Sequence, residues 1–438
     1  MSSKIRRTLF SLSLVLLGAT LALTACYEQR DPTYWAKTFD YADSTQSVFS
    51  LTPTPDGGYV IAGTVTINSG SLMDLGDLWA AKLDSEGRVE WQKVFSGSKV
   101  EIGIDGMSVI RTSDGGYALS CRSNSFTGEF SAWVLRLDGS GNVLWQKVYE
   151  QSVFHTHAAV LRETQDGGLA LLSSELIRMD ASGNVLWTRS YAYAEGGDFE
   201  LMSMETAADG GFILAGRLVD AHYIGYFDGI VMKTDASGNP VWKVEMGSDR
   251  VFTEINAVRQ VSDGYVAVGA SGTAGSMARD FLIVKLSPSG ALLWQKRFDL
   301  KGDAEEFRSV DTASDGSVVA AGHTNGYDAG DIILAKFRTD GTAEWIKKYD
   351  AERCEAREVR RTVAGYAVGG SNGLGLLISV DPSGAIPNAG SRIQTLNPSL
   401  VSTAMVTGSK PLVLENSTVV AGATQAVLKT LALTVKDL

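Results

Sequence analysis

A short motif recurs along this chain about every 50 residues, and such a period limits the possible folds more than any other feature. It begins with an Asp-Gly turn, first seen in Asp56-Gly57-Gly58-Tyr59. The turn returns, with some variation, at Asp114, Asp166, Asp209, Asp263, Asp315 and Gly365. A second element that contains a tryptophan follows the turn, at Trp91, Trp145, Trp187, Trp242, Trp294 and Trp345. The chain therefore consists mainly of repeats.

Each repeat is predicted to form four short strands. In the first repeat they cover residues 46–52, 59–64, 78–83 and 89–95. An Asp-Gly turn between apolar runs is a strong hairpin signal. Four strands per repeat without helical periodicity are typical of a β-propeller blade. The seven turn elements predict an all-β, seven-bladed β-propeller over residues 35–386.

The two ends of the repeat region indicate how the ring closes. The last repeat contains Leu377 but lacks its tryptophan strand, and the chain passes on to Ile386. The missing strand matches residues near the N-terminus, because Trp35-Ala36-Lys37-Thr38-Phe39 resembles the tryptophan strand of the first repeat. We expect this N-terminal strand to complete the last blade and to remove a free sheet edge. An open solenoid is the alternative, but it would not need a displaced strand.

The repeats resemble those of many exported bacterial and archaeal propellers, most of them of unknown function. The tryptophan element also resembles the tryptophan-docking motif of quinone-dehydrogenase-like propellers. That group includes the propeller lipoprotein that scaffolds outer-membrane protein assembly. The third repeat departs from the pattern, because Ser173-Ser174-Glu175-Leu176 replaces the loop between its second and third strands.

Residues 1–25 are predicted to be a lipoprotein signal peptide. A basic start is followed by an uncharged apolar stretch, residues 9–23, which is short for a membrane span. The stretch ends in Leu23-Thr24-Ala25-Cys26, which resembles the lipobox of bacterial lipoproteins. The alternative is an ordinary signal peptide with a chance cysteine.

The resemblance to a lipobox implies acyl chains such as palmitate on Cys26, which would anchor the protein to a membrane of the cell envelope. Residues 26–34 would then be a lipidated tether. Tyr27 follows the cysteine where an aspartate would retain a lipoprotein in the inner membrane, so the analogy favours the outer membrane. Residues 387–438 are expected to be a small C-terminal appendage, extended or β, with one or two strands near the weakly alternating segments 412–414 and 426–428.

Charge and composition exclude several functions. The net charge of −11 argues against nucleic acid as a partner. Three cysteines cannot form a disulfide scaffold, and Cys121 and Cys354 fall in blades that are not neighbours. The sequence has no zinc-protease motif and no phosphate-binding loop, and no catalytic residue is assigned.

Two recurring columns of residues are predicted to be structural. The tryptophans should pack between blades. The basic residues of the third strands should form an outer or inter-blade structural feature rather than a ligand site. These are Lys82, Arg136, Arg178, Lys233, Lys285 and Lys336.

A third column is the candidate site. It lies nine residues before each turn aspartate, or before its equivalent Ala364. Its members are Ser47, Asp105, His157, Glu200, Glu254, Glu306 and Glu355. In a propeller these residues would start the innermost strands, so we expect their acids to gather at the channel. Such a cluster favours a cation or ligand site, with Ca²⁺ as the candidate cofactor. The alternative is that each acid accepts hydrogen bonds from the backbone or from a basic residue of the adjacent blade.

The sequence therefore predicts a membrane-anchored extracytoplasmic binding or scaffold lipoprotein. Its variable loops, residues 64–77, 122–131, 217–228 and 270–280, would present a surface to a protein or glycan partner. The alternative is a carbohydrate-active hydrolase or lyase that uses the channel-mouth carboxylates as acid and base. The regularity of the acidic column counts against the enzyme, because catalytic residues usually interrupt a repeat.

Overall fold

The computed structural model describes most of the repeat region and short segments of the C-terminal part. The described residues are 34–40, 45–66, 76–97, 101–102, 106–127, 130–150, 159–193, 197–220, 227–247, 251–273, 275–276, 278–300, 304–324, 330–350, 354–371, 374–387, 393–396, 399–401, 406–408, 412–415, 421–423, 427–429 and 434–437. In this part of the chain the regular elements are strands. No helix there has the length and apolarity needed to cross a membrane. The predicted signal peptide and Cys26 lie outside the described residues.

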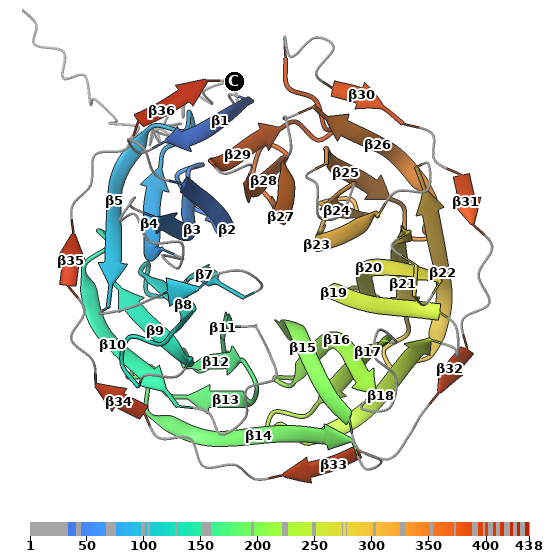
Figure 1. Ribbon diagram of the computed structural model, residues 1–438, viewed down its shortest axis with the longest axis horizontal. Helices are drawn as coiled ribbons and strands as arrows, with labels where there is room; N and C mark the ends of the chain where they lie inside the picture. The colour runs from blue at the N-terminus through green and yellow to red at the C-terminus, as the bar shows by residue number, and fades with distance from the viewer. Residues whose placement is uncertain are drawn as a thin grey trace, which may run out of the picture. The chain divides into compact units, whose positions relative to one another are not determined.

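The strands form the seven blades of a β-propeller around a central axis, which confirms the predicted fold (Figure 1). Within each blade neighbouring strands are antiparallel, and the first strand is innermost. Blade 1 contains β2 (Thr45–Pro53), β3 (Tyr59–Thr66), β4 (Asp77–Leu83) and β5 (Val89–Ser96). Blade 2 contains β6 (Glu101–Ile102), β7 (Ser108–Arg111), β8 (Tyr117–Ser123), β9 (Ser131–Leu137) and β10 (Val143–Tyr149). Blade 3 contains β11 (Val160–Glu163), β12 (Leu169–Leu172), β13 (Leu176–Met179) and β14 (Val185–Tyr193).

The remaining blades follow the same order. Blade 4 contains β15 (Gly197–Thr206), β16 (Phe212–Asp220), β17 (Phe227–Thr234) and β18 (Pro240–Gly247). Blade 5 contains β19 (Val251–Val261), β20 (Gly264–Thr273), β21 (Arg279–Leu286) and β22 (Leu292–Asp299). Blade 6 contains β23 (Glu306–Thr312), β24 (Val318–His323), β25 (Ile332–Phe337) and β26 (Ala343–Tyr349). Blade 7 contains β27 (Glu355–Arg361), β28 (Tyr366–Ser371) and β29 (Gly375–Val380).

The fourth strand of blade 7 is β1 (Trp35–Asp40), from the other end of the chain. It pairs antiparallel with β29, with Trp35 opposite Ser379 and Lys37 opposite Leu377. Figure 1 shows this strand at the seam between the first and last blades. The pairing confirms that the N-terminal strand closes the ring.

The recurring tryptophans fix the contact between successive blades. The ring of Trp35 lies against Gly87 of blade 1, where a Cβ atom would come within 2.7 Å of the indole. Its Nε1 donates a hydrogen bond to the Ser85 carbonyl at 3.0 Å. The same ring-on-glycine contact joins Trp91 to Gly141, Trp145 to Gly183, Trp187 to Gly238, Trp242 to Gly290, Trp294 to Gly341 and Trp345 to Gly384. Inter-blade packing of the tryptophans is therefore confirmed.

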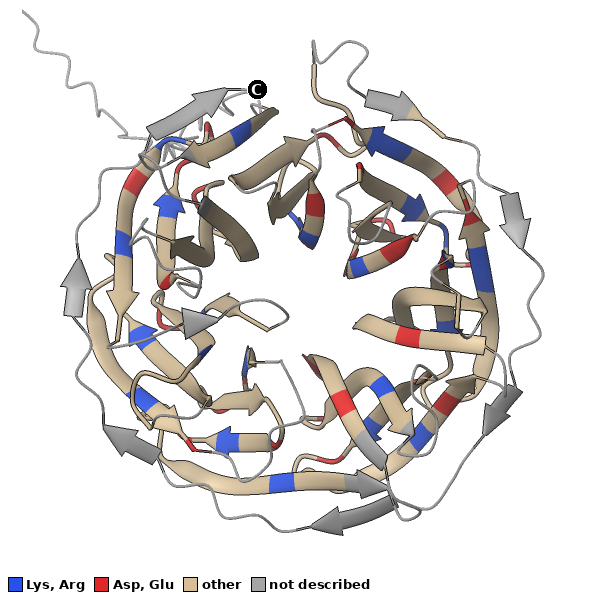
Figure 2. Cartoon of the chain, in the orientation of Figure 1, with Lys and Arg blue, Asp and Glu red and all other residues tan. Residues whose placement is uncertain are grey.

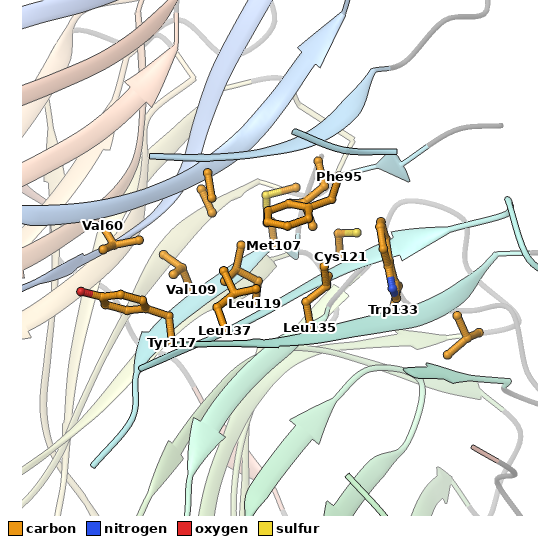
Figure 3. Close-up of a cluster of buried hydrophobic side chains, with 14 residues drawn as sticks. Val60, Phe95, Met107, Val109, Tyr117, Leu119, Cys121, Trp133, Leu135 and Leu137 are labelled. Atoms are coloured by element: carbon orange, nitrogen blue, oxygen red, sulfur yellow. The ribbon is translucent and has the colours of Figure 1, made fainter. Parts of the chain in front are cut away.

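Apolar side chains fill the space between adjacent blades. In Figure 3, Val60 and Phe95 of blade 1 face Leu119, Leu135 and other apolar side chains of blade 2. Cys121 belongs to this cluster; it and Cys354 are both buried, and no disulfide joins them.

The basic column of the third strands stabilises the hairpin turn of its own blade, so its structural role lies within a blade and not between blades as the sequence suggested. Lys82 is only 4 % exposed, and its Nζ lies 2.8 Å from Asp56 Oδ2 and donates to the Leu83 carbonyl at 2.9 Å. A Cβ atom on Gly58 would come within 2.8 Å of the same Nζ, so the second turn glycine makes room for the lysine. Equivalent pairs are Asp114–Arg136, Asp166–Arg178, Asp209–Lys233, Asp263–Lys285 and Asp315–Lys336.

The C-terminal residues form seven short strands, more than the one or two that the sequence suggested. They are β30 (Ile393–Thr395), β31 (Ser399–Val401), β32 (Val406–Gly408), β33 (Leu412–Glu415), β34 (Ala421–Ala423), β35 (Val427–Lys429) and β36 (Thr434–Asp437). Each pairs antiparallel with the outermost strand of one blade, in the order of blades 6, 5, 4, 3, 2, 1 and 7. We call these seven strands the belt; Figure 1 shows it around the rim.

The belt explains how the propeller protects its outer edges. Successive belt strands begin six to nine residues apart, a length of extended chain that reaches from one blade to the next. Each belt strand takes up backbone groups that an outer strand would otherwise expose as an edge.

Deletion of residues 388–438 should therefore destabilise the propeller and promote self-association. The loss is expected to reach several kcal/mol, because each backbone hydrogen bond contributes about 0.5–1.5 kcal/mol. Thermal unfolding and light scattering measure the two effects. A shorter deletion of residues 434–438, which removes only β36, should have a smaller effect on both. A truncated protein that stays monomeric with an unchanged midpoint would show that the belt does not protect the edges.

The turn aspartates should make the fold sensitive to acid. Burial alone would raise the pKa of Asp56, but hydrogen bonds from Lys82, Thr54 and the Gly58 amide lower it from 3.8 to about 2. Because the pKa is lower in the folded than in the unfolded chain, the charged form stabilises the fold above pH 3.8, and this contribution is lost between pH 3.8 and about 2.

Asp56→Asn should therefore weaken the dependence of the unfolding free energy on pH across that range. The Asp56 side chain is 54 % exposed, so the difference should be below ~1 kcal/mol. Urea unfolding of the wild type and of the variant at a series of pH values measures it. Identical pH profiles for the wild type and Asp56→Asn would contradict the assignment.

Candidate functional site

A cavity of about 120 Å³ lies on the axis of the propeller. The innermost strands, or the residues just before them, contribute to its wall in all seven blades. Some of its lining residues are apolar, namely Phe49, Met107, Val160 and Met202. Others are polar or charged, namely Asn256, Arg162, Arg259, Arg308, Arg357, Arg360 and Glu358. The cavity is therefore amphipathic.

A β-bulge at the same place in five inner strands aims one side chain at this cavity. The register shifts between Val48 and Ser50 in blade 1, and at the matching positions of blades 4, 5, 6 and 7. A bulge leaves its extra residue unpaired and redirects its side chain. The redirected residues are Phe49, Met202, Asn256, Arg308 and Arg357. We call these five the bulge residues; their chemistry changes from apolar to polar around the ring.

Charges alternate around the inner strands of five consecutive blades. The residues four positions before the turn aspartate, or before Ala364, are Arg162, Glu205, Arg259, Asp311 and Arg360 in blades 3 to 7. Arg259 lies between two acids, with its Nη1 3.0 Å from Glu205 Oε2 and its Nε 3.7 Å from Asp311 Oδ1. Arg162 Nε is 3.5 Å from the same Glu205 oxygen. The alternation stops at blades 1 and 2, which carry Thr52 and Ile110.

Hydrogen bonds between neighbouring inner strands hold this wall in place. Ser50 Oγ accepts a hydrogen bond from the Val109 amide at 3.0 Å, and Ser203 Oγ accepts one from the Val258 amide at 3.2 Å. At the seam between blades 7 and 1, Glu358 takes the place of the serine. Its Oε2 accepts a hydrogen bond from the Leu51 amide at 2.5 Å. The blades are thereby tied together at the axis.

The sequence-predicted acids in blades 4 and 5 share one arginine. Arg217 on β16 lies 2.6 Å from Glu200 Oε2 through Nε and 2.7 Å from Glu254 Oε2 through Nη1. Burial would lower the pKa of Arg217, but the two carboxylates raise it above its usual value. This contact crosses from blade 4 to blade 5, so the two acids and the arginine form part of the inter-blade packing.

The acids in blades 6 and 7 are also paired with basic groups, and Figure 2 shows charges of both signs on the inner strands β23 and β27. Glu306 Oε1 lies 2.7 Å from Arg308 Nη2 and 3.1 Å from His323 Nε2. Burial opposes its ionisation, but these two groups hold the pKa of Glu306 below its usual value. Glu355 is paired with Arg357.

The seven members of the acidic column therefore fall into three groups. Its four described acids face nitrogen donors, which compete with a metal ion for the carboxylate oxygens. Ser47 Oγ lies 2.9 Å from Ser371 Oγ. Asp105 and His157 lie outside the described residues.

Another group of carboxylates lies where β21 begins and β22 ends in blade 5, together with Glu305, which directly precedes β23. Asp280, Asp299 and Glu305 have oxygen atoms within 4.8 Å of one another, and oxygen donors are those that Ca²⁺ prefers. However, Arg297 pairs with Asp280, and the Leu300 amide donates to Glu305 at 2.8 Å. Protein groups therefore already neutralise part of this cluster.

The bulge residues were missed by the sequence analysis, which looked for chemistry that recurs in every repeat. They lie only two residues after the acidic column, but their side chains differ from blade to blade. They could have been found by looking for a repeat position that has constant spacing but a different side chain in each blade.

Comparisons with known proteins assign no function. No family model and no curated protein matches the chain. Among solved structures, a catalytically inactive virginiamycin B lyase from Staphylococcus aureus has a TM-score of 0.45 at 10 % identity, covering 79 % of this chain and 99 % of that one. A protein of unknown function from Dyadobacter fermentans has a TM-score of 0.45 at 11 % identity, covering 79 % and 98 %. A glucose dehydrogenase has a TM-score of 0.41 at 13 % identity, covering 69 % and 99 %.

Proposed function

We propose that this protein is a binding or scaffold lipoprotein of the outer membrane. Acyl chains on Cys26 would anchor it, and loops on one face of the propeller would bind a protein or glycan partner. These loops, residues 64–77, 122–131, 217–228 and 270–280, all connect the second and third strands of their blades, so they emerge at one end of the propeller. The proposal combines a lipid anchor with a rigid body.

One observation favours binding over catalysis: the described acids of the inner column are engaged in ion pairs. Arg217 holds Glu200 and Glu254, Arg308 and His323 hold Glu306, and Arg357 holds Glu355. The Arg217–Glu254 pair joins blades 4 and 5, and all of these pairs leave fewer carboxylate oxygens for a substrate. A scaffold needs this rigidity in order to present its loops in a fixed arrangement.

The alternative function is a carbohydrate-active hydrolase or lyase, and one observation favours it. Burial, together with the nearby charge of Glu306, raises the pKa of Glu254, while the pKa of Glu306 is lowered. Two carboxyl groups with pKa values shifted in opposite directions can serve as acid and base. Glu254→Gln would abolish any glycan cleavage by this pair, and unchanged turnover would exclude it.

Crosslinking in whole cells tests the binding proposal. The wild-type protein should fractionate with membranes and give a discrete crosslinked product with one partner. Replacement of the loop at residues 270–280 by a Gly/Ser linker of equal length should remove that product but leave membrane association intact. Substitutions at Glu86 and Arg88 provide the control and should retain the product. These residues lie at the turn between the third and fourth strands of blade 1, at the opposite end of the propeller from the loops.

Cys26→Ala tests the anchor separately. This variant should move to the soluble fraction, because it cannot carry the acyl chains. A Cys26→Ala protein that remains with the membranes would contradict lipid anchoring. A crosslinked product that survives replacement of each of the four loops would contradict the proposed binding face.

A further inference from the structure

We propose that the axial cavity binds a small carboxylate with a short apolar tail. Arg162 and Arg259 would hold the carboxylate, and Phe49, Met107 and Met202 would contact the tail. This site lies among the inner strands and is separate from the loops of the proposed partner surface, so it does not depend on that proposal.

Arg162 has guanidinium donors that the protein leaves available. Its Nη1 donates to the Leu161 carbonyl at 2.7 Å, and its Nε lies 3.5 Å from Glu205, beyond good hydrogen-bonding distance. In the part of the chain that the structure describes, its Nη2 donates a hydrogen bond to no acceptor. The corresponding residue of blade 2 is Ile110, which offers no charge on that side. Because Arg162 lines the cavity, these donors are placed to bind an anion there.

Arg259 offers a second set of donors from blade 5. It is 9 % exposed and lines the same cavity. Its Nη1 donates to Glu205 at 3.0 Å and to the Val258 carbonyl at 3.2 Å, whereas its Nη2 has no acceptor among the described residues. Glu205 is therefore shared by two arginines, and the nearer one is Arg259.

Asn256 adds a neutral polar group to the same wall. It is 7 % exposed, and its Nδ2 donates to the Phe307 carbonyl at 2.9 Å. Its Oδ1 is buried and accepts no hydrogen bond from the described residues. A buried polar atom without a partner is costly, so a water or a donor group on a ligand would stabilise it.

The charges around Arg162 also favour a bound anion. Burial lowers the pKa of Arg162 to about 10, and the positive charges of Arg259 and Arg360 add to this effect against the opposing charges of Glu205 and Glu358. Glu205 already offsets part of this repulsion, and an anion bound to the Nη2 groups of Arg162 and Arg259 would add to that compensation. A planar carboxylate suits the site because it can accept two parallel hydrogen bonds from a guanidinium group.

The size and the apolar wall restrict the ligand further. About 120 Å³ corresponds to roughly four water molecules at ~30 Å³ each, which is room for a few heavy atoms. Phe49, Met107 and Met202 lie on blades 1, 2 and 4 and cannot solvate a second charge. Inorganic phosphate and sulfate would leave charged oxygens against this wall, whereas a short alkyl tail would be buried there.

Calorimetric titration of the full-length protein with acetate, butyrate and inorganic phosphate, at constant ionic strength, tests the site. Butyrate should bind most tightly, with about a fourfold gain in affinity for each methylene that becomes buried. Arg162→Met should lower the affinity for butyrate about tenfold or more, because hydrogen bonds to a charged group are lost. This substitution leaves Glu205 paired with Arg259, so the protein should remain folded.

Two further variants complete the test. Arg162→Lys keeps the charge but loses the planar fork, and it should still bind butyrate several-fold more weakly than the wild type does. Arg88→Met removes an exposed arginine far from the axis and should bind like the wild type.

Three results would overturn the proposal: no binding of either carboxylate, equal affinity for acetate and butyrate, or unchanged butyrate affinity in both Arg162 variants. Tight binding of phosphate alone would also overturn it and would instead indicate a general anion site. Each of these results would leave the loop-binding proposal standing, because that proposal is tested by crosslinking at the loops.

Discussion

The structure depends on one constraint, which is that seven nearly equal sheets must meet in a closed ring. The contact of each fourth-strand tryptophan with a glycine of the next blade sets the spacing between sheets. A residue with a side chain at Gly87 would meet the indole of Trp35 at 2.7 Å, so this contact has little tolerance. β1 supplies both the strand and the tryptophan at the seam, and the ring closes without a special junction. The belt then follows the closed ring and pairs with every blade.

Closure also determines what reaches the axis. Repeated residues build the frame, for example Lys82 with Asp56 in the hairpin and Ser50 with the Val109 amide between blades. The bulge residues and the alternating charges of the inner strands depart from the repeat, and they line or neighbour the cavity. In a repeat protein, positions that keep the same residue type in every repeat usually serve the fold. A position whose residue type changes from repeat to repeat is not under that demand, so it can carry specificity.

The sequence was sufficient for those features that local pattern determines. Asp-Gly turns, the tryptophan column and the displaced strand at Trp35 together predicted the blades and the closure. The belt was harder to predict, because only two of its strands, Leu412–Glu415 and Val427–Lys429, coincide with visible alternation. Strands of three or four residues that pair along only one edge need no strong apolar pattern of their own. The partners of the inner acids could not be predicted either. Arg217 bonds Glu254 from another blade, and no repeat rule places an arginine there.

The closed ring itself is tested most directly by a disulfide across the seam. Ala36 lies opposite Ile378 in the pairing of β1 with β29, and both pack against the same apolar cluster. Directly opposed residues of antiparallel strands are close enough for a disulfide. A protein carrying Ala36→Cys and Ile378→Cys should oxidise to a single intramolecular crosslink, detected by peptide mass spectrometry. The pair Lys37→Cys and Ile378→Cys, which is out of register, should not. Failure of the first pair to crosslink in folded protein, or equal crosslinking of both pairs, would contradict closure by the N-terminal strand.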